Sequence, residues 1–119
     1  MVNTIFYKIT LIENPTEFYI GSCLDLTRRK SQHKKNTTNK VRTQYWNNLY
    51  FFIRLKGGWD KMEMKKIFEI DCPTKDIRHQ YEQAFIDLLK PTLNSVNVIL
   101  EKNKPDLTDI LNQLKTLNL

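Results

Sequence analysis

Alternating apolar and aromatic residues at the start of the chain constrain its fold more than any other feature. Within residues 3–11, the side chains that share one face are Ile5, Tyr7, Ile9 and Leu11. This period of two predicts a half-buried β-strand. Residues 17–22 have the composition of a second strand, and residues 13–16 (Glu-Asn-Pro-Thr) are typical of a turn. The sequence therefore predicts a β-hairpin in which Tyr7 and Tyr19 can lie side by side.

Helical spacing follows the hairpin. Asp25 is a favourable N-cap for a helix over residues 26–35, and the polar residues 36–43 predict a loop. A second helix is predicted over residues 44–56 and would end at Gly57-Gly58, because glycine tolerates the left-handed conformation that commonly follows a helix. The apolar residues at helical spacing in this segment are Trp46, Leu49, Phe52 and Ile53.

The second half of the chain predicts one more strand, over residues 62–70, and two more helices. The first of these helices lies between Thr74, a favourable N-cap, and Pro91, and its buried stripe consists of Ile77, Tyr81, Ala84, Phe85 and Leu88. The second is predicted over residues 105–118, with Pro105 in its first turn. Its apolar side is formed by Leu107, Ile110, Leu111, Leu114 and Leu117. A chain of 119 residues in this order is expected to form one α+β domain.

Positive charge is concentrated in one part of the chain. The net charge is +6, and residues 26–42 contain seven basic residues and no acidic one. These residues are Arg28, Arg29, Lys30, Lys34, Lys35, Lys40 and Arg42. A stretch of one sign favours a polyanionic partner such as nucleic acid, although a solvated basic loop is the alternative explanation.

The two cysteines, Cys23 and Cys72, do not form a Cys-x-x-Cys pair, which argues against a disulfide framework or a structural zinc site. Isolated thiols suit an intracellular compartment. No apolar run approaches the roughly 20 residues that span a bilayer, and no signal peptide is recognisable, so we expect no membrane association.

Candidate catalytic residues recur at characteristic spacings. The segment Tyr19-Ile20-Gly21 is followed by Arg29, ten residues after its tyrosine, and by His33 one helical turn later. Glu82 begins a run with an aromatic residue three positions later and isoleucine four positions later, and this run closes at Asn94. Metal-assisted phosphodiester cleavage needs a carboxylate to hold a cation, a base for water and an arginine for developing charge.

This pattern resembles the GIY-YIG endonuclease family over residues 4–94. Tyr7 is what remains of the first motif, because Ile5 and Phe6 stand where that family usually has Gly and Ile or Val. The resemblance implies a three-stranded antiparallel sheet flanked by helices over residues 1–97, with residues 98–119 as a C-terminal extension. The Phe-Ile-Arg and Gly-Gly-Trp-Asp segments within residues 52–60 are similar to members found in large DNA viruses and mobile elements.

The resemblance also implies roles for the motif residues. Glu82 would be the only metal-binding side chain, and one carboxylate with water ligands suits Mg²⁺ or Mn²⁺. Arg29 would stabilise charge on the phosphate, and Asn94 would order the site through hydrogen bonds. Tyr7, helped by Tyr19 or His33, would take a proton from the attacking water. Some family members have a further helper in the preceding loop, for which Tyr45 is the candidate; a packing aromatic is the alternative.

The expected substrate is DNA, double-stranded or branched, contacted through Arg28, Lys30, Lys34, Lys35, Lys40 and Arg42. Considered alone, each motif residue has an ordinary structural explanation, since strands favour tyrosine and a helical glutamate is usually a surface charge. Two other functions therefore stay open: a catalytically inactive nucleic-acid-binding module of the same fold, and a protein-interaction domain. The chain would be a monomer, or a homodimer through its last helix.

Overall fold

The structure is a computed structural model, and it describes residues 3–94. The elements in chain order are β1 (Thr4–Leu11), β2 (Asn14–Cys23), α1 (Leu26–Thr38), α2 (Asn48–Leu55), β3 (Met62–Ile70) and α3 (Lys75–Leu89). Two short 3₁₀ helices, η1 (Thr43–Trp46) and η2 (Trp59–Lys61), flank α2. The expected α+β fold is confirmed. The predicted helix over residues 105–118 and the division after residue 97 lie outside the described residues.

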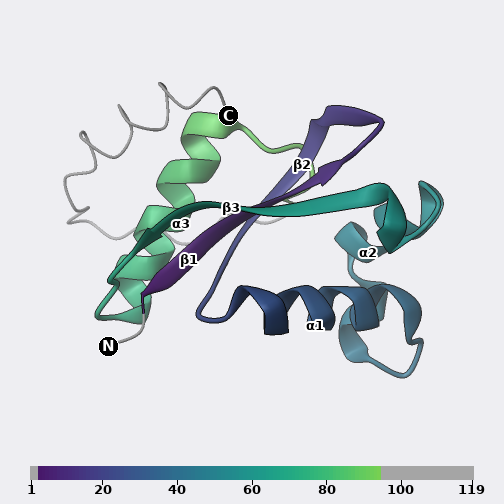
Figure 1. The fold of residues 1–119 in the computed structure, drawn as a ribbon, viewed down its shortest axis with the longest axis horizontal. Coiled ribbons are helices and arrows are strands. Elements are labelled where there is room, and N and C mark those ends of the chain that lie inside the picture. The colour runs from purple at the N-terminus through teal and green to yellow at the C-terminus, as the bar shows by residue number, and fades with distance from the viewer. Residues whose placement is uncertain (1–2, 95–119) are drawn as a thin grey trace.

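The three strands form one antiparallel sheet in the order β2-β1-β3, so β1 is the central strand (Figure 1). The hairpin register pairs Tyr7 with Gly21 and Ile9 with Tyr19. The predicted turn over residues 13–16 is wrong in its extent, because β2 already begins at Asn14. Pro15 fits in this strand because β2 lies at the edge of the sheet, where a missing N–H breaks no ladder bond.

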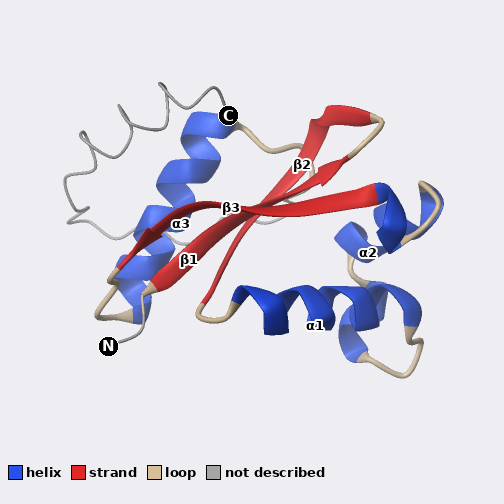
Figure 2. Cartoon of the chain, viewed as in Figure 1, coloured by secondary structure: helices blue, strands red, loops and turns tan. Residues whose placement is uncertain are grey.

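Helices cover both faces of the sheet, with α1 and α2 on one side and α3 on the other (Figures 1 and 2). Successive side chains of β1 point to opposite faces of the sheet. Tyr7, Ile9 and Leu11 pack with residues of α2, whereas Phe6 packs against Phe85 of α3. The chain thus has two small cores separated by one sheet.

The first helix is longer than predicted. Asp25 caps it as expected, with its carboxylate accepting a hydrogen bond from the backbone N–H of Arg28 at 3.1 Å. However, α1 continues to Thr38 through residues predicted to form a loop. Thr37 is buried there, and its hydroxyl donates to the carbonyl of His33. Hydrogen bonds of this kind let the polar residues at the end of α1 be buried inside the domain.

The predicted second helix is split in two. The 3₁₀ helix η1 ends at Trp46, and α2 begins only at Asn48, because Asn47 has an extended backbone (φ −69°, ψ 150°). Leu49 and Ile53 are buried as predicted, but Trp46 is 70% exposed. Tyr50 takes a buried position that the predicted stripe did not include.

The third strand and the third helix lie close to their predicted positions. The hydroxyl of Thr74 caps α3 by accepting from the backbone N–H of Ile77. The helix ends where Lys90 adopts a left-handed conformation (φ 52°), just before Pro91. Gly57 and Gly58 also have positive φ and terminate α2 as expected. In the part of the chain that the structure describes, no helix is both long and apolar enough to cross a bilayer.

Candidate active site

A cleft of about 740 Å³ opens between α1, the segment around η1 and α3. Residues far apart in the sequence line it together. Of the predicted site residues, those that line it are Tyr19, Arg29, Arg42, Glu82 and Asn94. The cleft therefore brings an arginine, a phenol and a carboxylate into one solvent-accessible space.

Tyr7 lies behind this cleft and is fully buried. Its hydroxyl accepts a hydrogen bond from Nε of Arg29 at 3.4 Å and lies 2.7 Å from Nε2 of His33. The close approach of Gly21 makes room for this hydroxyl, because a Cβ at Gly21 would meet the Tyr7 hydroxyl and lie 2.9 Å from Cε1 of Tyr19. Glycine at this position is thus required by packing, while its backbone conformation is an ordinary extended one.

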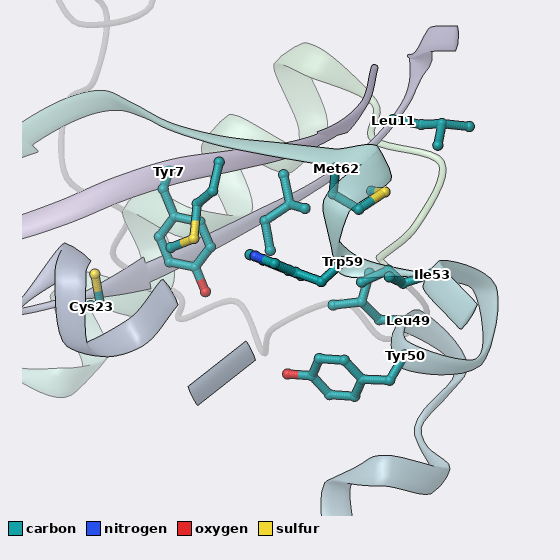
Figure 3. Close-up of a cluster of buried hydrophobic side chains, with 10 residues drawn as sticks. Tyr7, Leu11, Cys23, Leu49, Tyr50, Ile53, Trp59 and Met62 are labelled. Carbon is teal, nitrogen blue, oxygen red and sulfur yellow. The ribbon is translucent and has the colours of Figure 1, made fainter. Parts of the chain in front are cut away.

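His33 joins Tyr7 to Tyr50 in a buried hydrogen-bonded chain. Its Nδ1 lies 2.7 Å from the Tyr50 hydroxyl, which also accepts from Nδ2 of Asn36 at 3.1 Å. The chain ends at Arg42, whose Nε donates to Oδ1 of Asn36 at 2.6 Å. Figure 3 shows the Tyr7 and Tyr50 rings extending toward each other from β1 and α2. The chain connects the fully buried Tyr7 to Tyr50 and Arg42, which line the cleft.

The direction of these hydrogen bonds follows from the charge state of His33. Burial, together with the neighbouring Arg29 charge, lowers the pKa of His33 to about 3, so the ring is neutral and carries one N–H. The fully buried Tyr7 hydroxyl already accepts from Arg29, and its own proton has no other acceptor within residues 3–94 than Nε2 of His33. Nδ1 of His33 then donates to the hydroxyl of Tyr50, a residue that lines the cleft.

The chain matches the GIY-YIG catalytic domain over residues 3–97, which is most of its length. It belongs to the GIY-YIG family. No curated protein and no solved structure gives a significant match. Membership in this nuclease family makes DNA the implied class of substrate, and nucleases of this family generally use a divalent metal ion.

Glu82 is the residue of the GIY-YIG pattern whose surroundings best suit a cation. Burial raises the pKa of its carboxyl to about 7, against the lowering effect of Arg78 and Arg29. Among the described residues its carboxylate makes no hydrogen bond or ion pair. Residues 3–94 hold no cluster of three His, Cys, Asp or Glu side chains, so a metal here would have one protein carboxylate and otherwise water or substrate ligands. Mg²⁺ accepts such a set, and the residues present fit it.

Asn94 attaches the segment after α3 to the free edge of β2. Its side-chain amide donates to the carbonyl of Ile20 and accepts from the Ile20 N–H, both at 2.8 Å. Thr92 and Leu93 continue this pairing through the backbone of Phe18. The expected ordering role of Asn94 agrees with this geometry, since the bonds hold the end of α3 beside Tyr19.

Both tyrosines resist ionisation in the free protein. Burial is the main cause for each: it raises the pKa of Tyr7 well above its usual range and raises that of Tyr19 to about 12. The neighbouring Glu82 charge adds to the shift of Tyr19, while Arg29 opposes both shifts. A phenol here can act as a base only if additional positive charge enters the cleft.

The structure does not bring Tyr45 to the cleft. Its ring packs under the guanidinium of Arg54 at 3.6 Å, which agrees with the packing alternative. Tyr50 is the tyrosine that contacts the His33 ring instead, and sequence reasoning missed it. The signal was present, because Tyr50 follows Leu49 and precedes Ile53 on the buried side of α2.

The basic residues of α1 divide between two surfaces. Arg29, with Gln32 and Asn36, faces the cleft. Lys30 and Lys34 line a shallower groove beside Trp59 and Met62. Arg28, Lys35 and Lys40 are exposed, the first two one turn away from Gln32 on α1. Of the predicted nucleic-acid-binding set, Arg42 therefore lies at the cleft, Lys30 and Lys34 at the groove, and the other three residues line neither.

Proposed function

We propose that this protein is a DNA endonuclease that hydrolyses phosphodiester bonds with one divalent cation, Mg²⁺ or Mn²⁺, held by Glu82. The observation that carries this proposal is that Arg29, Tyr19 and Glu82 line one cleft beside the buried Tyr7–His33 pair, with no partner for the Glu82 carboxylate among residues 3–94. A cation bound there would polarise the scissile phosphate and stabilise the leaving oxygen.

Arg29 is suited to bind the reacting phosphate. Its guanidinium is oriented by two hydrogen bonds, from Nε to Tyr7 and from Nη1 to Oε1 of Gln32 at 3.1 Å. The fixed fork of donors matches two phosphate oxygens, and its charge acts strongly because the side chain is half-buried. The positive charge of Arg29 would stabilise the charge that develops on the phosphate in the transition state.

Tyr7 is the proposed acceptor of the proton from the attacking water. As water loses this proton to the Tyr7 oxygen, the Tyr7 proton passes to Nε2 of His33, and Nδ1–H of His33 passes its proton to Tyr50. The Tyr50 proton leaves to water in the cleft, so the net result is transfer of one proton to solvent. Water reaches Tyr7 only after a bound phosphate draws the Arg29 guanidinium outward, because Tyr7 is fully buried in the free protein.

This pathway makes Tyr50 a positioning and relay residue, which Tyr50→Phe tests. We expect a lower kcat, an unchanged KM and a rate that rises at high pH, where hydroxide bypasses the relay. Tyr19→Phe is the comparison variant, because Tyr19 lines the cleft and is the alternative base. If Tyr19→Phe loses cleavage while Tyr7→Phe and Tyr50→Phe keep it, the proton acceptor is Tyr19 and the relay is wrong.

The endonuclease proposal itself is tested by nicking of supercoiled plasmid with Mg²⁺, with Mn²⁺ and with a chelator. Glu82→Gln should abolish cleavage and keep DNA binding, whereas Glu63→Gln, the same change at an exposed glutamate of β3, should cut normally. A Glu82→Gln variant that cuts at the normal rate would contradict the metal assignment.

A protein that binds DNA but cuts with neither ion would be the inactive module. The departure from the family's first motif does not favour that outcome, because the Phe6 side chain packs against Phe85 in the apolar cluster beneath α3 and does not line the cleft. No reacting group is lost there.

A further inference from the structure

Trp46 stands exposed at the catalytic cleft. It lines the same space as Arg29 and Glu82, and 70% of its surface is accessible. Single exposed apolar residues are common on protein surfaces. This one is unusual in its position, because it stands exposed beside a mostly polar and charged lining, in which the apolar residues Leu49 and Ile86 are buried.

The indole of Trp46 packs against a second aromatic ring that is itself supported from below. Its ring meets that of Tyr45 edge to face, with centroids 4.8 Å apart. Tyr45 in turn packs under the Arg54 guanidinium, which donates to the carbonyls of Tyr45 at 2.9 Å and Thr37 at 3.1 Å. A rigid, exposed aromatic ring loses little conformational entropy when a ligand stacks on it.

The neighbours of Trp46 have the chemistry to receive a nucleotide. Gln44, Asn47 and Asn48 line the cleft beside it, and their amides can both donate to and accept from the edge of a base. Arg29 and Arg42 supply positive charge in the same space for the phosphate. In continuous duplex DNA the flat faces of the bases are covered by their neighbours, so an indole finds no face to stack on. An unpaired base offers that face.

We propose that Trp46 stacks on an unpaired base next to the phosphate that enters the cleft, so that the protein prefers single-stranded or branched DNA to continuous duplex. This assignment rests on the proposed function only for DNA as the substrate class, because stacking needs neither the metal nor cleavage. Tyr45 and Arg54 then serve as the support that fixes the stacking ring.

The test measures binding in the presence of a chelator, with a 12-nucleotide single strand and with the same sequence as a blunt duplex. Trp46 and Trp59 are the two tryptophans, and Trp59 is buried, with its ring stacked on His33. We expect the single strand to quench tryptophan fluorescence in the parent protein and to leave that of Trp46→Phe, which reports Trp59 alone, nearly unchanged.

Affinities measured by anisotropy of a labelled strand complete the test. Trp46→Ala should bind the single strand about 5- to 150-fold more weakly, the range typical for loss of one stacked base, and should bind the duplex as the parent does. Phe51→Ala is the matched control, because Phe51 is also exposed, at 60%, and does not line the cleft. It should change neither affinity.

Two results would overturn the proposal: an unchanged single-strand affinity in Trp46→Ala, or equal losses for single strand and duplex. Thermal unfolding of Trp46→Ala shows that a loss is not due to misfolding, which is not expected for so exposed a residue. Cleavage assays separate this proposal from the previous one. A protein that does not cut but loses its single-strand preference with Trp46 supports stacking alone, and one that cuts without such a preference supports the nuclease alone.

Discussion

The two faces of the sheet are built from the same three strands and differ in what they bury. The α3 face is apolar at its centre, with Phe6, Phe18, Ile20, Phe85 and Ile86. The α1–α2 face buries a hydrogen-bonded chain of polar groups, which consists of Tyr7, His33, Tyr50 and Asn36. Buried polar groups stabilise a fold only when every partner is present, whereas apolar groups of similar size carry no such condition. The apolar cluster on the α3 face therefore serves mainly stability, although α3 also carries Glu82 to the cleft, and the α1–α2 face holds the hydrogen-bonded groups that the proposed proton transfer uses.

The largest expected effect is on the apolar face. Phe85→Ala removes a ring that contacts Phe6 and Phe68, with centroids 4.9 and 5.9 Å away. Phenylalanine-to-alanine changes in cores typically cost about 3–5 kcal/mol of unfolding free energy. Urea unfolding should show this loss, while cleavage per folded molecule at low temperature should stay near the parent value. A large loss of activity in fully folded Phe85→Ala would break the division between the two faces.

The next effect concerns the polar face and turnover. Arg29→Ala should lower the rate of cleavage by about 10²–10³-fold, as is common when a preorganised donor to the reacting group is lost. Arg28→Ala is the matched control, because it removes the same charge one residue earlier from an exposed position. We expect this control to weaken DNA binding modestly and to keep turnover. Equal losses of turnover in the two variants would show that only the total charge matters.

The composition of the two faces was only partly predictable from the sequence. Alternation in β1 and helical spacing in α3 indicated the sheet and the apolar core, because both depend on local periodicity. The order of the motif residues indicated Arg29, Glu82 and Asn94 as site residues. The break at Asn47 was not predictable, since residues 44–56 have apolar side chains at helical spacing on both sides of it. The exposure of Trp46 follows from that break.

The extension of α1 was missed for a related reason. Asn36 and Thr37 are polar and were assigned to a loop, yet they are buried because tertiary partners satisfy them, among them Tyr50, Arg42 and the carbonyl of His33. The secondary-structure propensity of a single residue carries no information about such tertiary partners. The regions where the sequence was least informative are therefore those that line or support the cleft, where polar groups are buried together.

A smaller effect concerns how the stability of the polar face depends on pH. Burial lowers the pKa of His33 from 6.5 to about 3. Above pH 6.5 His33 is neutral in both states, but below it the unfolded chain binds a proton that the folded protein excludes. The free energy of unfolding should therefore fall between pH 6.5 and 3 by up to about 1.4 kcal/mol per pH unit from this residue.

His33→Gln isolates this contribution. Urea unfolding of both proteins at pH 7, 6, 5 and 4.5 cancels the titration of groups that they share. The variant should be less stable than the parent at pH 7, because the Tyr7 and Tyr50 hydroxyls lose their partner, and the difference should narrow as the pH falls. A constant difference would mean that His33 titrates with a nearly normal pKa and that the polar face is more open to water than the structure indicates.

The smallest expected effect extends the comparison to the two sides of α1. Arg28 and Lys35 lie one turn from the cleft-lining Gln32, whereas Lys30 and Lys34 line the groove beside Trp59. A strand that enters the cleft can reach the first pair more easily. The double variant Arg28→Gln/Lys35→Gln should therefore reduce the slope of log affinity against log salt by about 1.4 for single-stranded DNA, at about 0.7 for each lost phosphate contact. Lys30→Gln/Lys34→Gln removes the same charge and should leave the slope nearly unchanged.

Two outcomes would contradict this path of the strand. If both double variants lower the slope equally, DNA wraps around α1 or is attracted by net charge alone. If only the lysine variant lowers the slope, the strand runs along the groove beside Trp59, and the path assigned to the cleft side is wrong.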